Sequence, residues 1–167
     1  ADGDGDLDVL TDADLFINDG SANFTDSGQN VGTGQERDFA DVDGDGDMDV
    51  VSNTIWFNDG TGVFTQGGQA GGGSSIDVGD VDGDGDLDIF RGTGGYNGNQ
   101  VWLNNGSGTF TNSGQGLNGS FDQSRAVQLA DFDNDGDLDA FAGNWQTQDR
   151  LWLNDGNGIF TLGFSTS

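Results

Sequence analysis

Cysteine, histidine, proline and lysine are all absent from this chain of 167 residues. Without cysteine and histidine, the chain has no disulfide, no thiolate chemistry, no zinc or copper site of the usual kind and no histidine-based catalytic triad. The chain also lacks any apolar run that approaches the roughly 18 residues of a membrane helix. The sequence therefore predicts no insertion into a membrane.

Positive charge is scarce as well, because four arginines face 30 acidic residues and leave a net charge of -26. Of the acids, 29 are aspartate, and Glu36 is the single glutamate. A surplus of this size makes nucleic acid and anionic membranes unsuitable partners. High charge and 32 glycines could indicate disorder, but 12 phenylalanines and 4 tryptophans at regular places favour packed cores.

The aspartates gather in four copies of one acidic loop. Residues 80–88 read DVDGDGDLD, with carboxylates at loop positions 1, 3, 5 and 9 and glycine at position 6. The glycine permits the sharp turn that directs alternate oxygens toward one hard cation. The pattern predicts bound Ca²⁺, with three to four ions for the whole chain.

We expect the aspartates of these loops to supply the metal ligands, and they hold 19 of the 29 aspartates in the chain. They are Asp2, Asp4, Asp6, Asp8, Asp41, Asp43, Asp45, Asp47, Asp49, Asp80, Asp82, Asp84, Asp86, Asp88, Asp131, Asp133, Asp135, Asp137 and Asp139. The first copy lacks position 1. Its first ligand and the strand before it would come either from a longer chain or from a neighbouring subunit.

A second signature follows each acidic loop: an aromatic and aliphatic segment, then Asn-Asp-Gly or Asn-Asn-Gly, then Phe-Thr. Its asparagine recurs at intervals of 40, 46 and 50 residues, a period that marks a repeat architecture. Asparagine and glycine tolerate the positive φ of tight hairpin turns. Each repeat then holds about four strands and no helix, the content of a propeller blade. The expected repeats of this single domain are residues 1–30, 31–70, 71–116 and 117–167.

Residues 80–90, DVDGDGDLDIF, and residues 101–111, VWLNNGSGTFT, together resemble the FG-GAP/VCBS repeats of integrin α-chain propellers and of many bacterial surface proteins. The resemblance implies an all-β fold of tandem four-stranded blades of β-propeller type, the first truncated at its N-terminus. It also implies calcium in the loop between two strands of one blade, with position 7 giving its backbone carbonyl. Because proline is absent, the Gly-Ala-Pro half of the motif is missing, and the bacterial VCBS form is closer.

The EF-hand is the main alternative for the acidic loops, since its loop begins in the same way. An EF-hand needs a bidentate glutamate at position 12 and flanking helices. Position 12 falls on Ser52, Arg91 and Ala142, and the flanking residues alternate with a period of two. The sequence therefore disfavours the EF-hand.

Aromatic residues fall into two groups. Trp56, Trp102 and Trp152 recur with the repeat and predict packing between neighbouring blades. Tyr96 and Trp145 lie instead in two insertions that lengthen the third and fourth repeats. Because longer loops on a rigid scaffold often carry binding sites, these two residues are the candidate ligand-binding residues.

These features together predict a non-enzymatic, calcium-stiffened module with a structural or adhesive role. Every clustered aspartate already has a metal-ligand role, and loops of this charge suit the calcium concentrations found outside cells. We therefore expect an extracellular or cell-surface protein of bacterial type. Its expected partners are further repeats or other subunits, in a ring, an open array or a filament. The alternative is a lectin-like module that binds glycans through the two insertions.

Overall fold

The computed structural model describes residues 1–32, 36–94, 98–117 and 123–166. Within this part of the chain there are fifteen strands, β1 to β15, and no helix. Accordingly, no described segment forms a helix that could cross a membrane. The strands form four antiparallel sheets, which we call blades 1 to 4 in chain order.

Three of the blades have four strands, and blade 1 has three. Blade 1 contains β1 (Val9–Leu10), β2 (Asp14–Asn18) and β3 (Phe24–Asn30). Blade 2 contains β4 (Asp38–Ala40), β5 (Asp49–Val51), β6 (Thr54–Asn58) and β7 (Phe64–Gln69). Blade 3 contains β8 (Ser75–Gly79), β9 (Asp88–Gly92), β10 (Gln100–Leu103) and β11 (Thr111–Asn112). Blade 4 contains β12 (Ser124–Ala130), β13 (Asp139–Asn144), β14 (Arg150–Asn154) and β15 (Phe160–Ser165).

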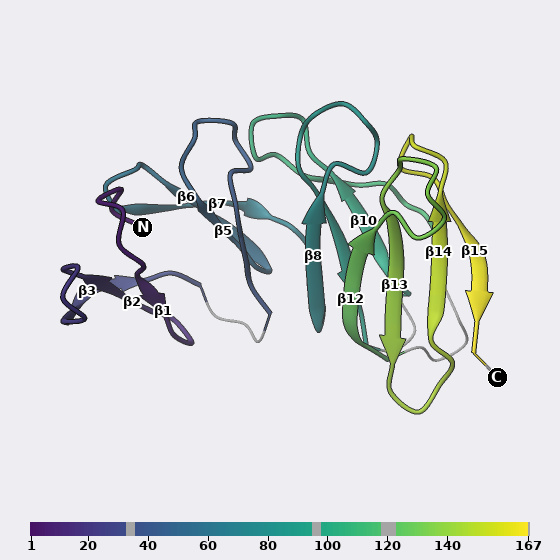
Figure 1. Cartoon of the computed structure of the whole chain (residues 1–167), viewed down its shortest axis with the longest axis horizontal. Coiled ribbons are helices and arrows are strands. Elements are labelled where there is room, and N and C mark those ends of the chain that lie inside the picture. The colour runs from purple at the N-terminus through teal and green to yellow at the C-terminus, as the bar shows by residue number, and fades with distance from the viewer. Residues whose placement is uncertain (33–35, 95–97, 118–122, 167) are drawn as a thin grey trace.

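Each blade is an up-and-down meander whose strands pair in chain order. The blades follow one another along the long axis of the molecule, with the two termini near opposite ends (Figure 1). The first strands of blades 2, 3 and 4 lie beside one another, since β8 contacts both β4 and β12. This arrangement confirms the predicted all-β fold of tandem blades. In blade 1, residues 1–8 lead into β1, and the described residues form the three strands β1 to β3.

Three hydrophobic clusters fill the spaces between successive blades. Leu15 of blade 1 packs with Val50 and Phe64 of blade 2, and Trp56 lies against this cluster. A second cluster joins blade 2 to blade 3 and a third joins blade 3 to blade 4. Because each blade buries its apolar face against its neighbours, the stack has the nearest-neighbour organisation of a repeat protein.

The recurring tryptophans lie at these interfaces, as the sequence predicts. Trp152 is only 6% exposed and belongs to the cluster between blades 3 and 4. Trp102 packs against the cluster between blades 2 and 3, close to Gly71. A Cβ on Gly71 would lie 2.7 Å from the Trp102 ring, so the chain between the two blades needs a glycine there.

The hairpin at the Asn-Asp-Gly signature differs from the tight turn that the sequence predicts. Asn58 ends β6 and pairs with Phe64, so that residues 59–63 form a longer loop. Gly60 has a φ of 75°, whereas Asn58 is not among the residues with positive φ. The prediction was wrong about this asparagine because its backbone continues the strand, and its side chain makes hydrogen bonds instead.

Candidate metal centres

The three complete acidic loops each connect the first strand of a blade to the second. We call residues 41–49, 80–88 and 131–139 loops 2, 3 and 4, and residues 1–8 loop 1. In each complete loop, three aspartates offer carboxylate oxygens that all lie within 4.8 Å of one another. The triples are Asp41, Asp43 and Asp45; Asp80, Asp82 and Asp88; and Asp131, Asp133 and Asp139. Each of these three clusters could hold a metal ion.

The aspartate at position 1 organises the backbone of its loop. In loop 2, Oδ1 of Asp41 accepts a hydrogen bond from the Gly44 amide at 2.9 Å, and Oδ2 accepts one from the Gly46 amide at 3.0 Å. Gly46 has a φ of 98°. This left-handed conformation at position 6 is the sharp turn that the sequence predicts, and glycine adopts it without steric strain.

The aspartate at position 9 is buried and connects its loop to the hairpin. In loop 3, Oδ2 of Asp88 accepts from the Val81 amide at 3.1 Å, while Oδ1 accepts from the Asn104 amide at 2.8 Å. Asp49 and Asp139 make the same pair of bonds in their own loops. Position 9 therefore fixes the start of the loop against the end of the blade's third strand.

The aspartate at position 7 places its carboxylate against the hairpin of its own blade. A Cβ on Gly60 would lie 2.4 Å from Oδ2 of Asp47, so this carboxylate packs against the hairpin glycine of its own blade. Asp86 packs against Gly106 in the same way. None of these position 7 carboxylates belongs to the three close triples of the described residues.

The protonation of the loop carboxyls is perturbed. Burial raises the pKa of Asp88 to about 6, despite the backbone hydrogen bonds from Asn104 and Val81. Burial also raises the pKa of Asp82, and the neighbouring carboxylate of Asp84 raises it further. Desolvation and like charges both disfavour ionised carboxylates, and a bound cation would reverse this effect. The loops thus have the electrostatic character of sites that favour a positive ion.

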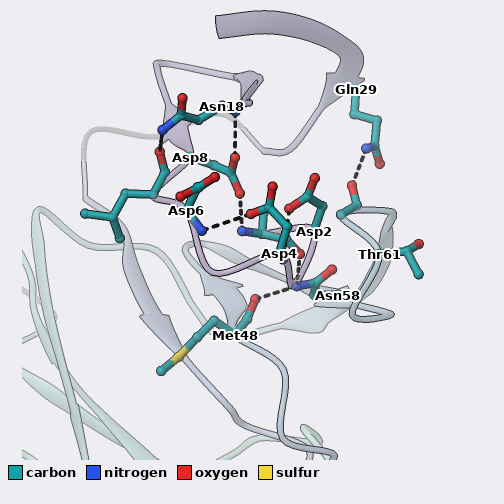
Figure 2. A network of polar contacts seen from close by, with 12 residues as sticks. Asp2, Asp4, Asp6, Asp8, Asn18, Gln29, Met48, Asn58 and Thr61 are labelled. Carbon is teal, nitrogen blue, oxygen red and sulfur yellow. Dashed lines mark hydrogen bonds and ion pairs between the residues drawn. The ribbon is translucent and has the colours of Figure 1, made fainter. Parts of the chain in front are cut away.

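Loop 1 keeps part of this geometry. Asp8 accepts hydrogen bonds from the Asn18 amide at 2.8 Å and from the α-amino group of Ala1 (Figure 2). The Asp6 amide donates to Oδ1 of Asp4 at 2.9 Å. Among the described residues, however, Asp2, Asp4 and Asp8 do not form a triple as close as those of the other loops.

The hairpin asparagines, Asn18, Asn58, Asn104 and Asn154, are residues whose role the sequence analysis missed. Nδ2 of Asn154 donates to the Leu138 carbonyl of its own blade at 3.1 Å and to the Val81 carbonyl of loop 3, in the preceding blade, at 2.7 Å. The sequence pattern predicts only a turn residue at this position. The occurrence of asparagine in all four copies, next to a position that varies, was the available sign of a further role.

Of the two candidate ligand-binding residues, the structure describes Trp145, which lies beyond the end of β13 in blade 4. Trp145 is 55% exposed, and the Arg125 guanidinium carbon lies 5.8 Å from the centre of its ring. A cation at this distance interacts favourably with the face of the indole. Tyr96 lies outside the described residues.

Tandem four-stranded meanders with an acidic loop after each first strand define a repeat protein of β-propeller type. The chain belongs to the FG-GAP-like repeat family, whose model matches residues 41–91 and 80–142. No curated protein matches the chain.

Among solved structures, the chain is similar to an Agrocybe aegerita lectin whose structure is described as the basis of specific recognition of non-reducing terminal N-acetylglucosamine. The two share 24% sequence identity over 95% of this chain, with a TM-score of 0.58. This chain spans about half of that protein, 48% of its length. At this level of identity, the likeness shows the fold alone.

Proposed function

We propose that this chain is a non-enzymatic calcium-binding module that stiffens a repeat scaffold outside the cell. The observation that carries the proposal is the gathering of three aspartate carboxylates within 4.8 Å in each of three loops. Such closely spaced negative charges repel one another, and the four arginines of the chain are too few to neutralise 29 aspartates. Bound cations would remove this repulsion.

The donor set favours calcium among the common metal ions. All the ligands are oxygens, which suit calcium, magnesium or manganese rather than zinc or copper. Calcium accepts six to eight oxygens in flexible geometry, whereas magnesium demands a near-ideal octahedron. A loop that offers carboxylates at several positions together with a backbone carbonyl therefore fits calcium best.

The place of the loops in the fold favours a structural or adhesive role. Each complete loop joins two strands of one blade, and loops 2 and 3 also accept hydrogen bonds from the following blade. An ion in such a loop would stiffen both the blade and its interface. Further repeats or other subunits are the proposed partners, and the bacterial cell surface or the medium around it is the proposed location.

Calorimetric titration of the metal-free chain with calcium tests this proposal. We expect at least three sites with dissociation constants around 0.1 to 1 mM or tighter, and weaker binding of magnesium. Asp82→Asn should remove one site, whereas Asp12→Asn, at an exposed aspartate outside the loops, should remove none. Absence of calcium binding up to several millimolar would contradict the proposal.

Glycan binding is a second candidate function, and the exposed Trp145 beside Arg125 favours it. Indole faces on exposed loops suit the apolar faces of sugar rings. A glycan array that includes terminal N-acetylglucosamine would test this function, with Trp145→Ala expected to abolish any binding. Phe164→Ala is a matched control because Phe164 is exposed to a similar extent, 54%. Equal losses in both variants would argue against a site at Trp145.

A further inference from the structure

We propose that the hairpin asparagines couple neighbouring metal sites, so that an ion in one blade raises the ion affinity of the loop in the preceding blade. The inference rests on the proposed function, since it requires that the loops bind ions. It assigns Asn58, Asn104 and Asn154 as positioning residues: they hold the backbone of a loop without contacting its ion.

The connection between loops 4 and 3 shows the relay most clearly. Asp139 belongs to the triple of loop 4, and its Oδ1 accepts a hydrogen bond from the Asn154 amide at 2.9 Å. The side chain of Asn154 then donates to the Val81 carbonyl at 2.7 Å. Val81 stands between Asp80 and Asp82, two members of the loop 3 triple. A few covalent bonds and two hydrogen bonds therefore connect the two candidate sites.

The relay recurs between blades 2 and 3, and the same asparagine contact is made between blades 1 and 2, where loop 1 gathers no aspartate triple among the described residues. The Asn104 amide donates to Oδ1 of Asp88 at 2.8 Å, and the Asn104 side chain donates to the Val42 carbonyl of loop 2 at 2.8 Å. Asn58 donates to the Ala1 carbonyl of loop 1 at 3.0 Å and to the Met48 carbonyl at 3.3 Å (Figure 2). Asn18 donates to the Leu7 carbonyl of its own blade at 3.1 Å. The three coupled asparagines thus use one geometry three times.

Burial makes these hydrogen bonds effective. Asn58, Asn104 and Asn154 are 4%, 7% and 6% exposed. A carbonyl that lost its asparagine here would lose its partner in a place where water has little access, which is unfavourable. The asparagine therefore restricts the loop carbonyl to one position.

The expected sign of the coupling is positive. An ion in loop 4 would fix Asp139 and, through Asn154, the Val81 carbonyl. Fixing Val81 orders the segment that carries Asp80 and Asp82, so that an ion entering loop 3 has less ordering to impose. Because coupling free energies are reciprocal, an ion in loop 3 must favour loop 4 by the same factor.

The interface between blades 3 and 4 also offers a matched control that bypasses the metal loops. Gln115 of blade 3 donates to the Gly158 carbonyl at 2.6 Å and accepts from the Phe160 amide at 2.8 Å. Gln115→Ala thus removes hydrogen bonds between the same two blades while leaving the Asn154 contacts with both loops in place. Any effect shared by Gln115→Ala and Asn154→Ala reports only a weakened interface.

The test measures the calcium affinity of loop 3 by calorimetry in a chain whose loop 2 is disabled by Asp43→Asn. Loop 4 is then disabled with Asp133→Asn, alone or together with Asn154→Ala. With Asn154 present, we expect the loss of loop 4 to lower the affinity of loop 3 about fivefold, the low end of typical allosteric coupling. With Asn154→Ala, loop 3 should already be weak, and disabling loop 4 should change it no further. Gln115→Ala should preserve the coupling.

Two results would overturn the inference while leaving the proposed function intact. One is calcium binding to loop 3 that is unaffected by loop 4 when Asn154 is present, a comparison that needs no change to the asparagine. The other is an equal effect of loop 4 with and without Asn154. If circular dichroism showed that the Asn154→Ala variant had lost its β-structure, Asn154→Ser would replace it in the test. A chain that bound no calcium at all would instead contradict the proposed function, and this inference with it.

Discussion

Loop 1 and the three complete loops share their hairpin contacts but differ in how they gather carboxylates. Asp8 and Asp88 both accept the amide of the following hairpin asparagine at 2.8 Å. Only the complete loops, however, bring three aspartate oxygens within 4.8 Å among the described residues. The hairpin of the blade therefore positions the aspartate at position 9 in all four loops. The gathering of the other carboxylates depends on the aspartate at position 1, whose carboxylate accepts hydrogen bonds from the amides at positions 4 and 6.

Removing the metal should have the largest effect on stability. The three complete loops would lose their bound ions, and with them an advantage over loop 1. An ion that binds only the folded state stabilises it by about 2.7 kcal/mol at a hundredfold excess over Kd. Three occupied loops would then contribute about 8 kcal/mol, which corresponds to roughly 15–30 °C in melting temperature for a domain of this size. Differential scanning calorimetry with calcium and with excess chelator measures this shift.

The control for chelation is a chain in which Asp43, Asp82 and Asp133 are all replaced by asparagine. Its melting temperature should no longer respond to chelator. An unmodified chain whose melting is equally insensitive would show that the acidic loops do not contribute to stability through a metal.

Blade 4 and blade 1 also differ at the recurring aromatic position, where Trp152 is replaced by Phe16. Trp152 is 6% exposed within a core cluster, so Trp152→Ala should destabilise the protein by about 3–5 kcal/mol through lost burial and a cavity. Phe16 lies in a blade of three strands and is only partly buried, so Phe16→Ala should cost less. Urea denaturation compares the two.

Trp145→Ala is the control for this pair, because Trp145 is 55% exposed and should change stability by less than about 0.5 kcal/mol. A larger loss for Phe16→Ala than for Trp152→Ala would contradict the view that blade 1 contributes the weaker core.

The sequence predicts the blades and the acidic loops because each depends on local patterns that repeat. Gly46 and the alternating aspartates specify the turn of the loop. The aliphatic and aromatic residues around Trp102 specify a β-strand. The role of Asn154 could not be predicted in this way. Its partner Val81 lies 73 residues away and offers a backbone carbonyl, which every residue possesses. Such a contact follows from how the blades stack, and leaves no distinctive residue at the accepting position.

Asp80→Ala should make loop 3 resemble loop 1. The substitution removes a carboxylate from the loop 3 triple and also removes the acceptor of the Gly83 and Gly85 amides at 2.8 and 3.1 Å. Loss of one ligand and one charge should weaken calcium binding to this loop by about tenfold or more, equivalent to about 1.4 kcal/mol. Calorimetry should then find one fewer tight site than in the unmodified chain.

The converse change is to insert an aspartate before Ala1, which would supply the missing position 1 of loop 1. If calcium binding by loop 1 increased, position 1 alone would account for the difference between the loops. If it did not, the missing carboxylate at position 1 would not by itself account for the difference between the loops.

The last contrast is a pH dependence that distinguishes Asp88 from Asp8. Burial raises the pKa of Asp88 from 3.8 to about 6, so the folded metal-free protein binds this proton more tightly than the unfolded chain does. The contribution of Asp88 to stability is therefore fully present below about pH 4 and is lost as pH rises through about 6. Burial also raises the pKa of Asp8, but hydrogen bonds from the α-amino group and from Asn18 lower it by more.

Asp8 should consequently act in the opposite direction, with a stabilising contribution that is present above the ordinary pKa of 3.8 and lost as pH falls below it. Calcium competes with the proton for Asp88, so the calcium affinity of loop 3 should fall as pH drops through about 6. Urea denaturation of the metal-free chain between pH 4 and 7 measures the first effect, and Asp88→Asn, which cannot titrate, should flatten it. If the parent chain and Asp88→Asn lost stability equally over this range, burial of Asp88 would not be the source of the pH dependence, and the two loops would not differ in this respect.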